Sequence, residues 1–363
     1  MSRATPPGTA GRRAPRALLT VSGILDADVA AQVAAGTRPR PDYAVLAERL
    51  DADVVDHDAA RAASGRVGRW IERLAGAHAV VAWWCFRERR RYDVILTDGE
   101  QVGLPLALLW RLTGRRHATH VMIVHIMSVP MKQRLFRWFR LGRCIDAMIV
   151  YSSWQQRFCV EQLGMPDDRV VRSPFMVDTD FFSPARADPP TRDGPVVATA
   201  GLERRDYATL IEAARDLDAR VVIAAASHFS TRHDSTEGVA RPDNVEVCSL
   251  TYVPLRQLYA DADVVVMPLE DVEFQAGVTT ILEAMAMDKA VVCSRTRGQV
   301  DIVDDEVNGV YVPPGDADAL RSAIERLLAH PDRARELGTA GRDFVERHAD
   351  VDVYADAVAS VCT

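Results

Sequence analysis

The chain has 363 residues, 48% of them hydrophobic and 26% charged, a globular composition that excludes a disordered tail or a fibre. Its length predicts two hydrophobic cores, since a single core rarely grows beyond ~250 to 300 residues. Six scattered cysteines without a C-x-x-C pair indicate neither a zinc knuckle nor a disulfide scaffold, and no apolar run reaches the ~18 residues of a membrane-spanning helix. We therefore expect a cytoplasmic protein.

Along the first half, apolar strands alternate with amphipathic segments, a pattern typical of βαβ units and a parallel sheet. Residues 1–16, rich in Arg, Pro and Gly, predict a flexible tail. The strands expected after this tail are Ala17–Val21, Asp53–Asp56, Asp93–Thr97, His120–His125 and Ala147–Tyr151. The helices expected between them are Tyr43–Leu50, Val67–Arg89, Gly103–Leu112, Met131–Leu141 and Trp154–Leu163.

A second alternating series follows a linker rich in Pro, Asp and Gly at residues 183–195. Its expected strands are Val196–Thr199, Val221–Ala225, Val245–Cys248, Val264–Met267, Ala290–Cys293 and Gly309–Val312. Its expected helices are Tyr207–Leu217, Leu255–Ala260, Thr280–Met287, Ala317–Ala329, Asp332–Arg347 and Val351–Val361. We expect domains at residues 17–182 and 183–350 and a C-terminal helix at 351–363. Two doubly wound α/β domains create a cleft, and ligands bind beyond the carboxyl ends of such strands.

The net charge of −7 is unevenly distributed. Residues 1–180 contain 26 Lys and Arg against 19 Asp and Glu, whereas residues 181–363 contain 18 against 32. Residues 101–145 hold eight Lys and Arg and no acidic residue, so we expect this segment to attract an anionic ligand or surface. A nucleic acid is not the expected partner, because the whole chain is acidic and lacks a basic and aromatic binding module.

Three common motifs are absent from the sequence. No G-x-G-x-x-G fingerprint follows the first strand of either predicted domain, so a hydride-transferring dehydrogenase is not expected. A G-x-x-x-x-G-K-[ST] phosphate loop and a G-x-S-x-G nucleophile elbow are missing as well. Asp-x-Asp pairs are so frequent in this chain that they do not predict a metal-held diphosphate.

The most informative stretch is DVEFQAGVTTILEAMAMDKAVVC, residues 271–293. A buried strand is followed by a loop containing Gly277 and then by a helix whose first turn holds Thr279, Thr280 and Glu283. Unpaired N–H groups at the start of a helix can bind a diphosphate without a metal, and Glu283 could accept hydrogen bonds from ribose hydroxyls. Alternatively, Thr280 and Glu283 form only a capping box, which stabilises a helix and binds nothing.

This stretch resembles the signature of the retaining GT-B glycosyltransferases of family 4, in which two Glu residues flank a Gly-containing loop before an EAMA helix, here Glu283–Ala286. PFMVDTDFFSP (residues 174–184) and GVYVPPGDADALRSAIERLLAHPD (residues 309–332) also resemble the family, so the resemblance covers essentially the whole chain. It implies a GT-B fold, with two Rossmann-like domains facing a cleft and the C-terminal helix packed back on the first. It further implies a glycosyltransferase that moves a sugar from a UDP- or GDP-sugar to a hydroxyl acceptor with retention, without a metal or another cofactor.

The resemblance places the donor in the second domain. It implies that Gln275 and Glu283 act in catalysis and that the other donor contacts are Glu273, Ala276, Gly277, Val278, Thr279 and Thr280. Gln275 departs from the pattern, because the family has a Glu eight residues before Glu283. An amide can bond to sugar hydroxyls but cannot stabilise developing positive charge as a carboxylate does. We expect Gln275 to contact the donor sugar, with Glu273 as a partial substitute for the missing carboxylate.

Arg204 and Arg205 supply the positive charge expected beside the diphosphate. They precede the predicted helix at Tyr207–Leu217, where two cations oppose the helix dipole unless an anion is bound. The family resemblance implies cations here, and guanidinium groups match phosphate oxygens bidentately. The alternative is a solvated helix start.

His125 and Gly23 are the candidates in the first domain, on the acceptor side. His125 ends a predicted strand, and the resemblance implies a catalytic site histidine that bonds to donor-sugar or acceptor hydroxyls. The alternative is a structural histidine. Gly23, in the turn after the first strand, is expected to let a substrate approach the backbone closely.

Residues 131–143 interleave Lys and Arg with aromatic residues. Such a helix can contact an anionic membrane peripherally, here at its inner face, and the acceptor would then be a lipid-linked sugar or phospholipid rather than a small-molecule glycoside. Alternatively, its rings lie in the core and its cations are solvated. Two other functions stay open: a GT-B-fold sugar-nucleotide epimerase and a non-catalytic sugar-nucleotide-binding protein.

Overall fold

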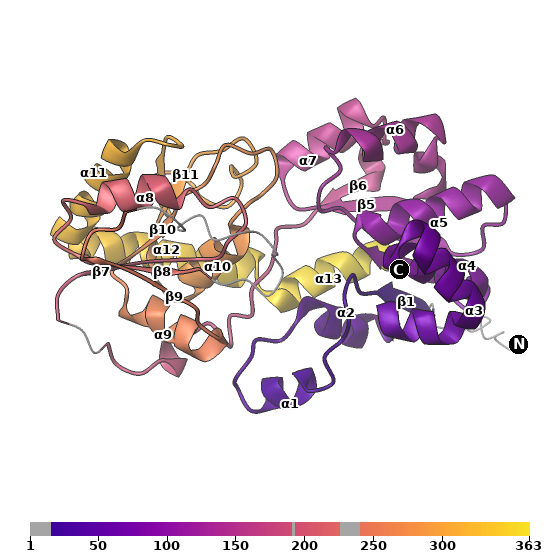
Figure 1. The fold of residues 1–363 in the computed structure, drawn as a ribbon, viewed down its shortest axis with the longest axis horizontal. Helices are drawn as coiled ribbons and strands as arrows, with labels where there is room; N and C mark the ends of the chain where they lie inside the picture. The colour runs from indigo at the N-terminus through magenta and orange to yellow at the C-terminus, as the bar shows by residue number, and fades with distance from the viewer. Residues whose placement is uncertain (1–15, 191–192, 226–239) are drawn as a thin grey trace, which may run out of the picture.

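The computed structural model describes residues 16–190, 193–225 and 240–363, which form two α/β domains, each built on a six-stranded parallel sheet (Figure 1). We call the domain with the first sheet the first domain and the other the second domain. This architecture confirms the predicted fold class. The predicted tail at residues 1–16, apart from Arg16, and two residues of the predicted linker lie outside the described residues.

The sheet of the first domain has the strand order β2-β1-β3-β4-β5-β6. Its strands are β1 (Ala17–Thr20), β2 (Asp53–Val55), β3 (Val94–Asp98), β4 (Thr119–Ile123), β5 (Ala147–Val150) and β6 (Val170–Arg172). Its helices are α1 (Val29–Ala34), α2 (Asp42–Leu50), α3 (His57–Ala75), α4 (Ala77–Glu88), α5 (Glu100–Thr113), α6 (Pro130–Trp138) and α7 (Ser153–Arg157). A π-helical turn at Phe158–Gln162 extends α7.

The sheet of the second domain has the order β12-β11-β10-β7-β8-β9. Its strands are β7 (Val196–Ala200), β8 (Arg220–Ala224), β9 (Val245–Cys248), β10 (Val264–Met267), β11 (Ala290–Ser294) and β12 (Val310–Val312). The helices of this half are α8 (Tyr207–Ala214), α9 (Tyr252–Asp261), α10 (Val278–Ala286), α11 (Ala317–Ala329), α12 (Pro331–His348) and α13 (Val351–Cys362). The central strands are short valine-rich runs buried on both faces, as a parallel sheet covered by helices requires.

Each sheet has one pair of neighbouring strands whose following connections run to opposite sides of the sheet, a topological switch point. In the first domain this point lies between β1 and β3, and in the second domain between β7 and β10. Ligands of open α/β sheets bind beyond the carboxyl ends of the strands at such points. The candidate site is therefore expected beyond the carboxyl ends of the strands at these two switch points.

Part of the predicted secondary structure was wrong. The single helix expected at Val67–Arg89 is divided between α3 and α4, because Gly76 adopts a φ of 84° between them. α3 itself contains a break at Gly65, whose φ of 54° is left-handed. An ion pair between Arg61 and Glu72 of 3.2 Å joins its two halves, so α3 is folded back on itself as two helical segments. Neither α1 nor β6 was predicted.

α13 packs on the first domain, as the family resemblance implied, and lies against α2 (Figure 1). Its Tyr354 and Val358 are buried in one cluster with Leu19 of β1 and Leu46 of α2. The chain passes from the first domain to the second near Val177 and returns to the first domain near Ala349. These two crossings lie side by side, because the N–H of Val177 donates to the carbonyl of Ala349 at 2.9 Å. The two interdomain crossings therefore run together as one paired segment.

Candidate functional site

The loop after β10 leads into α10 through a glycine that no other residue type could replace without strain. Gly277 precedes the helix with a φ of 78°, and a Cβ atom there would lie 2.6 Å from Sδ of Met267. No side chain caps the start of α10. Its first N–H groups, at Val278, Thr279 and Thr280, therefore remain available to an anion at the positive end of the helix. Of these three residues, Val278 and Thr280 are buried and Thr279 is exposed.

Glu283 lies one turn into α10 and is 7% exposed. Its Oε2 accepts a hydrogen bond of 2.9 Å from the hydroxyl of Tyr259 on α9. Burial raises the pKa of Glu283 to about 7, although the Tyr259 hydrogen bond and the charge of Arg205 both act to lower it. The predicted alternative of a capping box with Thr280 is wrong, because the residue before the helix is Gly277 and Glu283 bonds to Tyr259 instead.

Arg205 is buried beside the start of α10. Its guanidinium donates to the carbonyls of Ala200 at 2.9 Å and Glu203 at 2.7 Å, and to Oγ1 of Thr280 at 3.4 Å. The structure thus brings Arg205, Thr280 and Glu283 together at the switch point between β7 and β10. A fixed positive charge beside free helical N–H groups is an arrangement that suits phosphate oxygens.

Arg204 points elsewhere. It has a φ of 56°, and its Nη1 forms an ion pair of 2.9 Å with Oε2 of Glu270. Its backbone carbonyl accepts from the N–H of Glu270, which ties the loop after β7 to the loop after β10. The structure therefore does not bring Arg204 and Arg205 together as a pair of phosphate ligands, and Arg204 is held by an acidic neighbour.

Gln275 is 8% exposed, and neither its Nε2 nor its Oε1 has a hydrogen-bond partner within the protein. A buried amide without partners costs free energy, so a ligand that supplies hydroxyl groups would satisfy it. Ala276 is buried beside it and donates its N–H to the carbonyl of Phe274 at 2.8 Å. Glu273 instead pairs with Arg297 at 3.2 Å, so its carboxylate is engaged outside the loop.

His125 follows β4 in the first domain and is oriented by an acidic neighbour that sequence reasoning missed. Its Nε2 lies 3.0 Å from Oδ1 of Asp98 at the end of β3. Burial alone would lower the pKa of His125, but the hydrogen bond and charge of Asp98 raise it above the ordinary value. Asp42 on α2 lies close to Asp98. Its pKa is raised to about 6, mainly by desolvation and then by the charge of Asp98.

A second carboxylate fixes the backbone at His125. Glu100, 1% exposed, accepts from the N–H groups of His125 at 2.9 Å and Ile126 at 3.2 Å, and from Nζ of Lys132 at 2.6 Å. Burial raises the pKa of Glu100, but Lys132 and, to a smaller extent, His125 together outweigh this and hold it below the ordinary value. Because its backbone and its ring are both held, His125 has one orientation toward the second domain.

A glycine that the sequence did not indicate, Gly99, packs against His125. Gly99 has a φ of 98°, and a Cβ atom there would lie 3.2 Å from Cδ2 of His125. A Cβ atom on Gly23 would meet no other atom within 4 Å, so there is open space beside this residue. That space leaves room for a substrate near Gly23, and its predicted role stays a prediction. Strand order rather than spacing brings Gly99 to the site, which is why the sequence did not indicate it.

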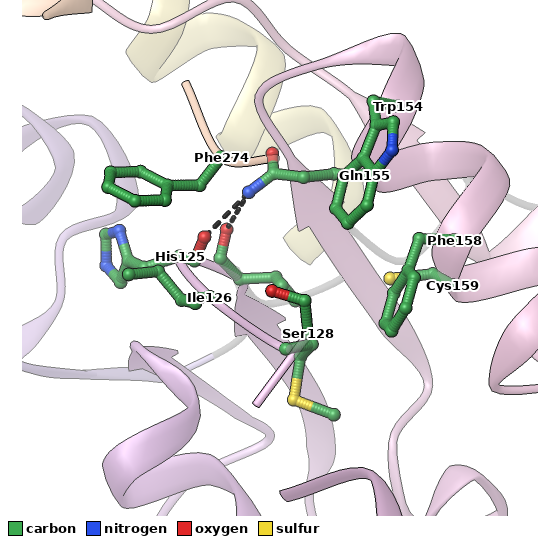
Figure 2. Close-up of a pocket in the computed structure, with 10 residues that line it drawn as sticks. His125, Ile126, Ser128, Trp154, Gln155, Phe158, Cys159 and Phe274 are labelled. Carbon is green, nitrogen blue, oxygen red and sulfur yellow. Dashed lines mark hydrogen bonds between the residues drawn. The ribbon is translucent and has the colours of Figure 1, made fainter. Parts of the chain in front are cut away.

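A small cavity of about 10 Å³, roughly the space of one water molecule, lies where Phe274 of the second domain meets the first domain (Figure 2). The first domain contributes His125 and residues of α7, including Trp154 and Gln155, and the second domain contributes Phe274. Figure 2 shows the ring of Phe274 beside that of His125, with the amide of Gln155 directed at two backbone carbonyl oxygens. Since Phe274 immediately precedes Gln275, the predicted donor loop and the predicted site histidine meet at this cavity.

Among the residues that the structure describes, no three His, Cys, Asp or Glu side chains gather in a way that could hold a metal ion. Within the same residues, every helix is too short or too polar to cross a bilayer.

Residues 195–330 match the family model described as glycosyl transferases group 1. Over 307 residues the chain is 32% identical to a GDP-mannose-dependent α-(1-6)-phosphatidylinositol monomannoside mannosyltransferase of Mycolicibacterium smegmatis, a match that covers 76% of this chain and 74% of the relative. The chain belongs to the group 1 glycosyltransferases. A Mycobacterium tuberculosis protein of the same name is 28% identical over 336 residues, 85% of this chain and 86% of the relative.

Two solved structures share the fold of this group 1 glycosyltransferase. The Anabaena protein HepE in complex with UDP-glucose has a TM-score of 0.68 at 16% identity, over 95% of this chain and 98% of that one. The trehalose 6-phosphate synthase of Burkholderia multivorans has a TM-score of 0.66 at 13% identity, over 96% and 98%. The predicted enzyme class, a glycosyltransferase with a sugar-nucleotide donor, is therefore confirmed, and neither the epimerase nor the non-catalytic binding protein is favoured.

Proposed function

We propose that this glycosyltransferase transfers mannose from GDP-mannose to a hydroxyl group of a lipid-anchored acceptor, with retention of configuration and without a metal ion. The observation that carries the donor site is the convergence of the free start of α10, Arg205 and the Glu283–Tyr259 pair at one switch point. GDP-mannose is favoured over a UDP-sugar by the Mycolicibacterium smegmatis relative, whose name specifies GDP-mannose.

In this proposal the second domain holds the donor. The diphosphate is bound by the N–H groups of Val278, Thr279 and Thr280 and by the charge of Arg205. These groups take the place of a metal ion. Glu283 accepts hydrogen bonds from the ribose hydroxyls, and Gln275 donates to and accepts from hydroxyls of the sugar.

The first domain presents the acceptor hydroxyl beside His125. The bond between the anomeric carbon and the diphosphate oxygen breaks as the acceptor oxygen bonds to the same face of that carbon. The proton of the acceptor hydroxyl passes to the departing diphosphate, so the charges balance and the configuration is retained. The main electrostatic task of the protein is then to stabilise the diphosphate as it leaves.

Thermal shift measurements with GDP, UDP, ADP and their sugars test the donor. A ligand at ~100 times its dissociation constant adds about 2.7 kcal/mol of stability, so GDP-mannose should raise the melting temperature clearly. Anomeric NMR of the product then tests retention, and an unchanged rate in EDTA tests metal independence. Stabilisation by UDP but not GDP would overturn the donor assignment, and an inverted product would overturn the mechanism.

We further propose that the enzyme contacts an anionic membrane at its inner face, where a lipid-anchored acceptor lies. In the predicted segment 131–143, Met131 is 71% and Trp138 is 88% exposed, but Phe136 is buried and Lys132 is bound to Glu100. The segment thus combines both predicted alternatives, since the ring of Phe136 is in the core and that of Phe139 packs against it, whereas Trp138 is at the surface.

A more regular face lies on the second half of α3. Val67, Trp70 and Leu74 are 51%, 65% and 67% exposed, and their spacing places them on one side of the helix. Arg66, Arg69 and Arg73 form a parallel exposed row beside them. An apolar row including a Trp, flanked by arginines, suits insertion at the boundary between anionic headgroups and acyl chains. Because α3 offers both rows, we propose that it supports the contact together with residues 131–143.

A further inference from the structure

One carboxylate of the second domain forms three contacts with the first domain. Oδ2 of Asp301 accepts from the backbone N–H of Ser153 at 2.8 Å and from its Oγ at 3.1 Å. Oδ1 of Asp301 pairs with Nη1 of Arg172 at 3.0 Å. The side chain of Asp301 is only 16% exposed, so its contacts with Ser153 are partly shielded from water, whereas Arg172 is 48% exposed. A charged acceptor bound by a helical N–H and a guanidinium is among the stronger hydrogen-bonding arrangements.

The loop that carries Asp301 is attached to the loop that carries Gln275. The N–H of Gly298 donates to the carbonyl of Val272 at 3.0 Å. A Cβ atom on Gly298 would lie 2.2 Å from the carbonyl oxygen of Phe274, so the two loops are in backbone contact. Arg297 adds its ion pair with Glu273. Asp301 and the residues directly before Gln275 are therefore held together as one part of the second domain.

On the other side of the interface, the same contact reaches His125. Ser153 is the first residue of α7, the pink helix that faces the second domain in Figure 1. Two residues later, Nε2 of Gln155 donates to the carbonyl of His125 at 2.7 Å, while its Oε1 accepts from the N–H of Tyr151 at 2.8 Å. Figure 2 shows the bond from Gln155 to His125 at the wall of the interdomain cavity. The position of α7 therefore fixes the backbone of His125.

We propose that Asp301 is a positioning residue that sets the distance between the donor loop and His125 by fixing α7 to the second domain. Asp301 itself touches neither reacting group. This inference rests on the proposed roles of Gln275 and His125 in the transfer reaction. It predicts that loss of the contact lowers turnover while the donor, held by the second domain alone, still binds.

The test compares D301N and D301A with the wild type. D301N keeps the shape of the side chain and removes its charge, so it keeps the proposal falsifiable if D301A folds poorly. We expect both variants to lose roughly 10- to 100-fold in kcat, the effect of a small misplacement of reacting groups, while the dissociation constant of the donor changes less than about twofold. The matched control is E306Q, which removes a carboxylate paired with Arg326 entirely within the second domain and should leave both values unchanged.

Two readouts do not depend on the identity of the substrates. Without ligand, D301A should increase the radius of gyration measured by small-angle X-ray scattering and the hydrogen exchange of the amides in α7. R172A should change the radius of gyration and the hydrogen exchange of α7 in the same direction. Because both substitutions break the same contact, the loss of turnover in the D301A/R172A double variant should be smaller than the product of the losses in the two single variants. Unchanged turnover or loss of donor binding in D301N, or unchanged domain separation in D301A, would overturn the proposal. If only the proposed donor is wrong, the scattering and exchange results still follow this pattern.

Discussion

The hydroxyl of Tyr259 and the carboxylate of Glu283 are joined by a hydrogen bond of 2.9 Å between α9 and α10, inside the second domain and beneath the start of α10. Both side chains are almost entirely buried, at 0% and 7% exposure. Because burial places the pKa of Glu283 at about 7, its charge changes within the physiological range, and donor binding should respond to pH.

We predict that donor affinity rises with pH as Glu283 ionises. With a pKa of about 7, the carboxylate fraction increases about tenfold between pH 6 and pH 8, and the dissociation constant should fall by a comparable factor. Calorimetry at both pH values measures this. Y259F removes a hydrogen bond that lowers the pKa of Glu283, so its transition should move to higher pH. A pH dependence that persists unchanged in E283Q would contradict the assignment.

The same ionisation affects folding in the opposite direction. Since the folded pKa of about 7 lies above the ordinary value of 4.5, the folded state binds the proton more tightly than the unfolded chain. The free energy of unfolding should therefore fall as the pH rises from 4.5 to 7, and E283Q should reduce this fall. Urea titrations at several pH values check the sign.

Q275L should be more stable than the wild type but less active. Replacing a buried amide that has no partner by an apolar side chain of similar size removes a desolvation cost, so the free energy of unfolding should rise by about 1 kcal/mol. Turnover should fall at least tenfold, because contacts to the donor sugar are lost. S64A is the matched control, since Ser64 is another buried group without a partner, and it should leave turnover unchanged. Equal turnover in Q275L and wild type would remove Gln275 from the site.

D98N should lower the pKa of His125 and slow the reaction. Burial lowers this pKa and Asp98 is the largest influence that raises it, so the neutral variant should move the histidine titration to lower pH. A raised histidine pKa stabilises the fold below the ordinary value of 6.5, and this contribution is lost as the pH rises through the folded pKa. D98N should weaken that dependence and reduce kcat about tenfold. NMR titration measures the pKa, and H117Q, at an exposed histidine, serves as control.

W70A/L74A should weaken binding to vesicles that contain anionic lipids. Both side chains are well exposed on α3, so the protein should fold normally and lose apolar insertion alone. Co-sedimentation measures binding, which should also weaken as salt is raised because of the neighbouring arginines. L112A removes another exposed apolar side chain, at the end of α5, and should have no effect. If W138A abolishes binding while W70A/L74A does not, residues 131–143 alone form the contact.

The donor side could be predicted from the sequence because its residues are contiguous. Gly277, Thr280 and Glu283 lie in one strand, loop and helix, where local spacing already determines which groups meet. Tyr259 comes from a neighbouring helix, and nothing in its own stretch indicates that it bonds to Glu283. Arg204 and Arg205 are adjacent in sequence, yet the left-handed φ of Arg204 turns their side chains to different partners.

The first-domain side was harder to predict because it is assembled across strands. Asp98 and His125 are brought together by the pairing of β3 with β4, and this pairing is not visible in either segment. The division between α3 and α4 was missed for a different reason, since apolar periodicity continues through Gly76 and only its φ ends the first helix. Long-range pairing and backbone conformation are therefore what the sequence left undetermined.

The burial of Tyr354 and Val358 against Leu19 and Leu46 has a consequence for synthesis of the chain. The ribosome makes β1 and α2 early, but it makes α13, the helix that covers them, only after the whole second domain. The second domain, whose sheet ends at Val312, can complete its core while the amino-terminal one still waits for α13. The half that is translated first is thus the half that matures last, and until then its uncovered leucines need protection from aggregation.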